Sequence, residues 1–107
     1  MRDHNELFQQ LCIEYDGVDG VRVPDGSERG FAAQAIKANG AVFVMLMRGQ
    51  IAVKLPAARV RELIDRGQGD PVSTGSRTPM REWVALTGTE DDVRPIIAEA
   101  EAFVAAQ

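Results

Sequence analysis

The side chains that could carry out catalysis are few and are scattered along the chain. His4 is the only histidine and Cys12 the only cysteine. A nucleophile and its general base must lie within hydrogen-bond reach, and no serine or cysteine stands at a recognisable spacing from His4, which lies at an end expected to fray. Cys12 falls in an amphipathic segment, which favours a small buried hydrophobe over a reactive thiol. The sequence therefore predicts a protein that is not an enzyme.

Three consecutive acids, Glu90, Asp91 and Asp92, could be read as paired carboxylates or metal ligands. They stand where a helix is expected to begin, and acids in that position commonly cap the helix and complement its dipole. We therefore expect neither a metal nor a cofactor.

Two glycine- and hydroxyl-rich segments, residues 67–70 and 73–78, superficially suggest a phosphate cradle. A P-loop ends in Gly-Lys-Ser/Thr and leads into a helix, and a dinucleotide fingerprint needs a third glycine after a strand. Neither pattern is present, so the segment is expected to be a turn-rich connection. The alternative is an anion held weakly by Arg77 and Arg81.

Charge is distributed unevenly along the 107 residues, which carry a net charge of -4 and have a pI of about 4.9. Residues 28–81 hold nine Lys or Arg against four acids, whereas both flanking segments are acidic. Phosphate contacts dominate nucleic-acid affinity, so the acidic balance argues against strong autonomous DNA binding. The central cations either pair with acids across the fold or form a local basic face.

The clearest structural pattern runs from residue 31 to residue 67. Asn39-Gly40 predicts a tight hairpin between strands at 31–38 and 41–47. The second of these strands is apolar on both faces and is therefore expected at the centre of the sheet. An alternating strand follows at 50–55, and a helix then begins at Pro56 and ends at Gly67.

The remaining elements flank this pattern. A helix at 4–15 is predicted to be capped by Asp3 and closed by Gly17, and residues 16–30 are expected to form an exposed connection. A short strand near 71–73 and a strand at 82–87 precede the last helix. That helix is expected to begin near Thr89 to Asp92, and Pro95 is expected to move its start toward Asp92. The chain is thus expected to form one domain, residues 1–107, of class α+β, with an antiparallel meander sheet packed against helices in the order α-β(3)-α-β(2)-α.

The two-sided apolar strand bears on assembly and location. Helices in a two-layer domain cover one face of the sheet, so the other face favours a homodimer, unless the carboxy-terminal segment of the same chain covers it. The amino terminus is polar, and the longest apolar run, residues 41–47, is too short to cross a bilayer. We expect a cytoplasmic protein that does not associate with membranes.

Three segments in order resemble the TfoX amino-terminal-domain family. They are Ile36-Lys37-Ala38-Asn39-Gly40-Ala41-Val42-Phe43-Val44-Met45-Leu46, Val53-Lys54-Leu55-Pro56-Ala57-Ala58-Arg59-Val60 and Pro79-Met80-Arg81-Glu82-Trp83-Val84. They are similar to that family's glycine hairpin, its Lys-Leu strand end and its Gly-Arg-Pro-Met-Lys-x-Trp-Val strand. The likeness spans residues 29–104.

The resemblance implies a two-layer α-β(3)-α-β(2)-α sandwich, shared with YjbR-like and secretion-chaperone-like proteins, which often dimerises. It carries over no catalytic residue. Residues 29–33 depart from the family's Arg-Met-Phe-Gly-Gly, and the second domain of full-length competence regulators has no room in this chain. Both departures put regulatory activity of that kind in doubt.

Two functional hypotheses follow. The first is a small non-enzymatic protein-interaction or regulatory module that binds a protein partner not yet identified and acts as a homodimer. The second is a nucleic-acid-associated accessory regulator, which binds weakly through mid-chain cations: Lys37, Arg48, Lys54, Arg59, Arg77 and Arg81. The candidate interaction residues are Lys54, Arg77, Arg81 and Trp83. We expect Trp83 in the core, the alternative being an exposed ring beside Arg77 and Arg81 that stacks on a ligand.

Overall fold

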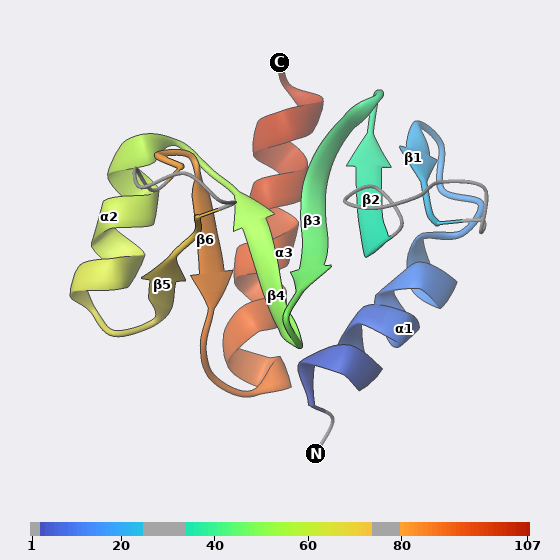
Figure 1. Ribbon diagram of the computed structural model, residues 1–107. Coiled ribbons are helices and arrows are strands. Elements are labelled where there is room, and N and C mark those ends of the chain that lie inside the picture. The colour runs from blue at the N-terminus through green and yellow to red at the C-terminus, as the bar shows by residue number, and fades with distance from the viewer. Residues whose placement is uncertain (1–2, 25–33, 74–79) are drawn as a thin grey trace.

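The computed structural model describes residues 3–24, 34–73 and 80–107. In these residues, three helices pack against a six-stranded antiparallel sheet, which confirms the α+β class (Figure 1). The elements are α1 (His4–Tyr15), β1 (Val21–Arg22), β2 (Ala35–Ala38), β3 (Ala41–Met47), β4 (Gln50–Lys54), α2 (Ala57–Asp65), β5 (Gly69–Pro71), β6 (Trp83–Leu86) and α3 (Glu90–Ala105).

The strands lie in the order β1-β2-β3-β4-β6-β5. Strands β2, β3 and β4 form the predicted meander, and β3 is central as expected. The meander prediction is wrong for the last two strands, because β6 pairs with β4 and leaves β5 outside it. The connection predicted at 16–30 also contains a strand, β1, whose two residues pair with β2 and are too few to produce an alternating pattern.

The turn between β2 and β3 has the predicted conformation. Asn39 and Gly40 have φ angles of 51° and 85° between β2 and β3. Arg48 and Gly49, with φ angles of 53° and 76°, make a second such turn between β3 and β4. Two consecutive positive φ angles match the twist of the flanking strands, so both turns support the register of the central hairpins.

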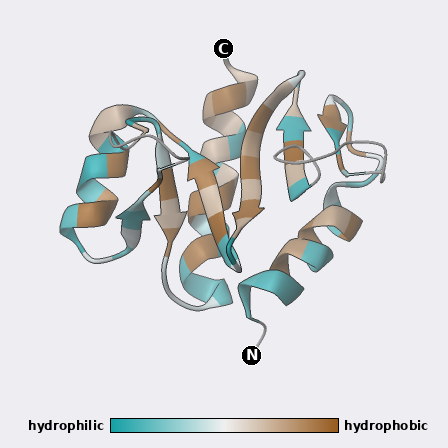
Figure 2. Ribbon diagram, viewed as in Figure 1, coloured by the Kyte–Doolittle hydropathy of each residue, from teal (hydrophilic) through white to brown (hydrophobic). Residues whose placement is uncertain are grey.

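The main core cluster lies between one face of the sheet and the helices. Helix α3 runs across the back of β3 and β4, and the two central strands are hydrophobic along most of their length (Figures 1 and 2). The largest fully buried side chains of the main core cluster are Leu7, Phe8, Ile36, Phe43, Ile51, Leu55, Leu63, Leu86 and Ile97. All three helices contribute side chains to this cluster.

The helix termini follow the sequence prediction at α1 and depart from it at α3. Asp3 caps α1, since its Oδ1 accepts from the Glu6 N–H at 2.8 Å. Helix α3 begins at Glu90 with Thr89 as its N-cap, within the predicted range but two residues before Asp92, toward which Pro95 was expected to move the start. Pro95 therefore lies inside the helix and removes one backbone hydrogen bond. Asp92 offsets this cost, because its Oδ2 accepts from both the N–H and the hydroxyl of Thr89, at 3.0 Å each.

Polar contacts join α1 to α3 above the core. Arg94 donates to both carboxylate oxygens of Glu14, at 2.9 and 2.8 Å, and to Glu90 at 2.7 Å. The Tyr15 hydroxyl donates to Glu101 at 3.0 Å, and the Tyr15 ring packs edge-on against Phe43. Burial, followed by the contact with Glu101, raises the pKa of Tyr15 to about 12.

A second, smaller cluster lies on the opposite face of the sheet, and among the described residues its members come from strands and connections rather than from helices. Its buried members are Ala35, Met45, Ala52 and Val72, and the partly buried hydrophobics packed against them are Val42, Met47, Met80, Trp83 and Ala85. Met45 is 1% exposed in the single chain. The middle of this face is therefore already covered, and the apolar surface left for a partner is the partly buried rim.

Trp83 departs in part from the core prediction. It packs against the second cluster, but its side chain is only partly buried because it occupies the first position of β6. Among the described residues, no helix is long and apolar enough to span a membrane.

Candidate functional site

A groove lies between α2 and the turn that leads into β6. Its volume is about 390 Å³. One wall is a continuous stripe of α2, because Ala57, Arg61 and Ile64 are spaced four and three residues apart and so share a face of the helix. The other described lining residues are Val60, Pro71, Met80, Arg81 and Trp83.

Backbone hydrogen bonds position the β6 side of the groove. The Met80 N–H donates to the Val72 carbonyl at 2.8 Å, which ties the turn to the residue after β5. The Leu55 N–H donates to the Glu82 carbonyl at 3.0 Å and extends the ladder between β4 and β6. The turn is thus attached at both ends to the sheet, which orients Arg81 and Trp83 toward α2.

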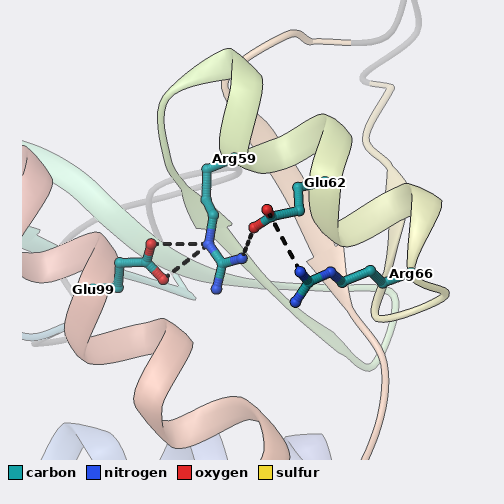
Figure 3. Close-up of polar contacts among 4 residues, drawn as sticks. All are labelled: Arg59, Glu62, Arg66 and Glu99. Carbon is teal, nitrogen blue, oxygen red and sulfur yellow. Dashed lines mark hydrogen bonds and ion pairs between the residues drawn. The ribbon is translucent and has the colours of Figure 1, made fainter.

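The two arginines of the groove are free of ion pairs within the described part of the chain. Both Arg61 and Arg81 are exposed at the groove. Other arginines nearby are engaged: Arg59 donates to Glu99 at 2.9 and 3.2 Å and also contacts Glu62 (Figure 3). The contact with Glu99, more than any other, raises the pKa of the Arg59 guanidinium. The groove therefore presents positive charge that the described carboxylates do not neutralise.

The structure brings together part of the predicted interaction set. Arg81 and Trp83 line the groove, and Lys54 lies beside Trp83 in the β4–β6 register. Lys54 is on the second face of the sheet, because its neighbours Val53 and Leu55 belong to the main core cluster. Arg77 lies outside the described residues.

The cations of the nucleic-acid hypothesis do not all converge. Lys37 shares the second face with Lys54, since Ile36 and Ala38 point into the main core cluster. Arg59 is instead bound to carboxylates of α2 and α3. Arg48 sits in the turn between β3 and β4, at the opposite end of β4 from Lys54. Lys37 and Lys54 thus share one sheet face, and Arg81 lies near Lys54 because Lys54 pairs with Trp83.

The lone histidine has a structural role that the sequence did not indicate. His4 Nδ1 accepts from the Ile51 N–H at 3.0 Å, so the ring hydrogen is on Nε2, which lies 3.1 Å from the Gly88 carbonyl. Both ring nitrogens are therefore occupied by backbone groups. The prediction that His4 lies in a fraying end is wrong, because these two contacts tie the first turn of α1 to β4 and to the loop before α3.

Cys12 and Asp92, which could also take part in chemistry, have structural roles. Cys12 is half-buried against the main core cluster, and burial raises the pKa of its thiol, which disfavours the reactive thiolate. Asp92 helps to cap α3, and the hydrogen bonds that it accepts from the N–H and the hydroxyl of Thr89 lower the pKa of its carboxyl. Within residues 3–24, 34–73 and 80–107, no group of three or more His, Cys, Asp or Glu could hold a metal ion.

No protein-family model matches the chain, and no curated protein or solved structure matches it.

Sequence reasoning missed the α2 side of the groove. Neither Arg61 nor Ile64 was among the predicted interaction residues, whereas the two lie together on the groove wall. The spacing of Ala57, Arg61 and Ile64 could have indicated that these residues share one face of the helix. The strand pairing that brings α2 beside β5 and β6 could not have been found in this way, because it depends on the insertion of β6 between β4 and β5.

Proposed function

We propose that the protein is a small non-enzymatic interaction module with a regulatory role, of the kind that the resemblance to the TfoX amino-terminal-domain family suggests. The observation that carries the proposal is the second face of the sheet. Its partly buried apolar rim includes Val42 and Met47 of β3 and Trp83 of β6, which also borders the groove beside α2. Partly exposed apolar side chains with polar neighbours are typical of a protein contact surface.

The partner that this rim fits first is a second copy of the chain. Helices α1 and α3 are fully engaged on the first face through the main core cluster, so association through the second face leaves the core undisturbed. The buried centre around Met45 and Ala52 limits the additional area that pairing removes from water. The homodimer is therefore proposed to form at micromolar concentration.

Light scattering after gel filtration tests this proposal. The wild type should show about twice the chain mass of 11.7 kDa, and the double variant Val42→Lys with Met47→Lys should run as a monomer with an unchanged circular dichroism spectrum. Ile13→Lys is the matched control, since Ile13 is 70% exposed and belongs to α1, which packs on the other face of the sheet. A mass of one chain for the wild type at every concentration would contradict the homodimer.

A second candidate function is weak association with nucleic acid. The specific support is that Lys37 and Lys54 lie on the second face without an ion pair to any described residue. Few phosphate contacts are available to a chain of net charge -4, so binding should disappear by about 0.15 M salt. A mobility-shift titration across salt, with Lys37→Glu and Lys54→Glu against Arg66→Gln, tests it. Tight, sequence-selective binding at that salt concentration would show that the acidic balance is misleading.

A further inference from the structure

We propose that the groove between α2 and β6 binds a small organic anion, a monocarboxylate with an apolar body. The inference goes beyond the proposed interaction module, because the groove is formed within one chain and does not require assembly. It rests on the composition, the charge and the size of the groove.

The floor and walls of the groove are mainly apolar. Ile64, Pro71, Met80 and Trp83 come from four separate segments of the chain and line the same hollow. An aromatic ring and a thioether make favourable contacts with aromatic or alkyl groups. This surface would withdraw the apolar body of a ligand from water.

The positive charge of the groove determines which head group a ligand should carry. Arg61 comes from α2 and Arg81 from the turn before β6, so the two guanidinium groups belong to opposite sides of the groove. No carboxylate is among its described lining residues. A guanidinium pairs with a carboxylate through two parallel hydrogen bonds, whereas an alcohol offers no charge to it.

The size of the groove favours a small molecule over a polymer. Its volume of about 390 Å³ falls within the range of about 300–1,000 Å³ that is typical of small-molecule sites. A folded partner or a nucleic acid would need a more extended surface than one helical stripe and one turn.

The binding test uses 4-phenylbutyrate as the probe and 4-phenylbutan-1-ol as its neutral analogue. Trp83 is the only tryptophan and lines the groove, so its emission, excited at 295 nm, reports occupancy directly. We expect a saturable blue shift with the carboxylate and binding weaker by about tenfold with the alcohol, because the charge-assisted hydrogen bonds are lost.

Variants of the two arginines then distinguish the contribution of charge to binding from that of the apolar lining. Arg61→Gln and Arg81→Gln should each weaken carboxylate binding by about five- to tenfold and leave alcohol binding unchanged. Arg66→Gln is the matched control: it also removes an arginine of α2, but this residue lies outside the groove and is 3.8 Å from Glu62. Circular dichroism establishes that each variant is folded.

Three outcomes would overturn the proposal. The first is a wild-type emission that does not change with 4-phenylbutyrate. The second is equal binding of the acid and the alcohol, unaffected by either groove variant. The third is binding of a short acidic peptide, alternating Leu and Glu, in the absence of any binding of 4-phenylbutyrate, which would make the groove a peptide site. Because mass and binding are measured separately, a monomeric wild type leaves this proposal intact.

Discussion

The two faces of the sheet differ in how completely they are closed. On the first face, Phe43 and Ile51 are fully buried beneath helices, and ion pairs such as that of Arg94 with Glu14 lie above the core. On the second face, Trp83 is partly buried, and Lys54 and Arg81 lie near it without carboxylate partners among the described residues.

This difference separates stability from recognition. Hydrophobic stabilisation scales with the apolar area removed from water, so most of the folding free energy should come from the first face. Exposed cations beside partly buried apolar side chains contribute little to folding, but they are available to a ligand or partner. Substitutions on the first face should thus act on stability, and those on the second face on binding.

The largest effect is expected for Phe43→Ala. Phe43 is 0% exposed and packs against the Tyr15 ring, with the centroids 5.5 Å apart. Its truncation should lower the free energy of unfolding by about 3–5 kcal/mol, because the site loses buried area and gains a cavity. Urea denaturation measures this loss. A loss below that of Trp83→Ala would break the proposed division between the faces.

His4→Ala should have the next largest effect, a loss of about 1–3 kcal/mol. The substitution leaves the Ile51 N–H without its ring partner in a part-buried position and removes the contact with the Gly88 carbonyl. Gln9→Ala is the control, because Gln9 lies on the exposed side of the same helix. Equal stability of the two variants, measured by urea denaturation, would show that the histidine contacts contribute nothing to folding.

Trp83→Ala should cost about 1–2 kcal/mol, since only part of the side chain is withdrawn from water. Truncation of a fully buried tryptophan would lower the free energy of unfolding by more, about 3–5 kcal/mol. Emission of the wild type should be intermediate between buried and exposed tryptophan, with partial quenching by iodide. A fully protected ring, together with a loss as large as that of Phe43→Ala, would place Trp83 in the core after all.

The phenol of Tyr15 provides a pH test of the first face. Its pKa is raised to about 12, so the folded state retains the proton to higher pH than the unfolded state, in which the pKa is about 10. The stabilisation is complete below about pH 10 and is lost as the pH rises toward about 12. Tyr15 is the only tyrosine, so absorbance at 295 nm follows it alone. In Glu101→Gln the midpoint should fall, and an unchanged midpoint would remove Glu101 as a cause.

The smallest effect is expected at the turn between β3 and β4. Arg48 has a φ of 53°, a conformation that asparagine adopts more readily than most residues. Arg48→Asn should therefore stabilise the fold by about 0.5 kcal/mol, and Arg48→Ala should not. Thermal unfolding of the two variants provides the comparison. Destabilisation by Arg48→Asn would indicate that the arginine makes a favourable contact that outweighs its strain.

Local patterns predicted the elements of the first face well. Asn39-Gly40 specified a hairpin, Asp3 specified the cap of α1, and the two-sided apolar strand at 41–47 specified the centre of the sheet. Each of these signals acts over a few residues. They do not depend on how distant segments meet.

The errors arose where long-range pairing decides the structure. The pairing of Lys54 with Trp83 places β6 inside the sheet, and no local pattern near either residue indicates it. The same insertion brings Arg61 and Arg81 to one groove, although they are far apart in the sequence. Pro95 misled the prediction because Thr89 and Asp92 stabilise the start of α3 strongly enough to accommodate an interior proline.

The two outermost strands have a consequence for colloidal behaviour. β1 has only two residues, and β5 has three and ends in Pro71, which has no N–H to offer an incoming strand. Short strands and proline at a sheet border hinder the addition of further strands from other molecules. Concentrated solutions of the folded protein should therefore resist conversion to fibrils despite the apolar central strands.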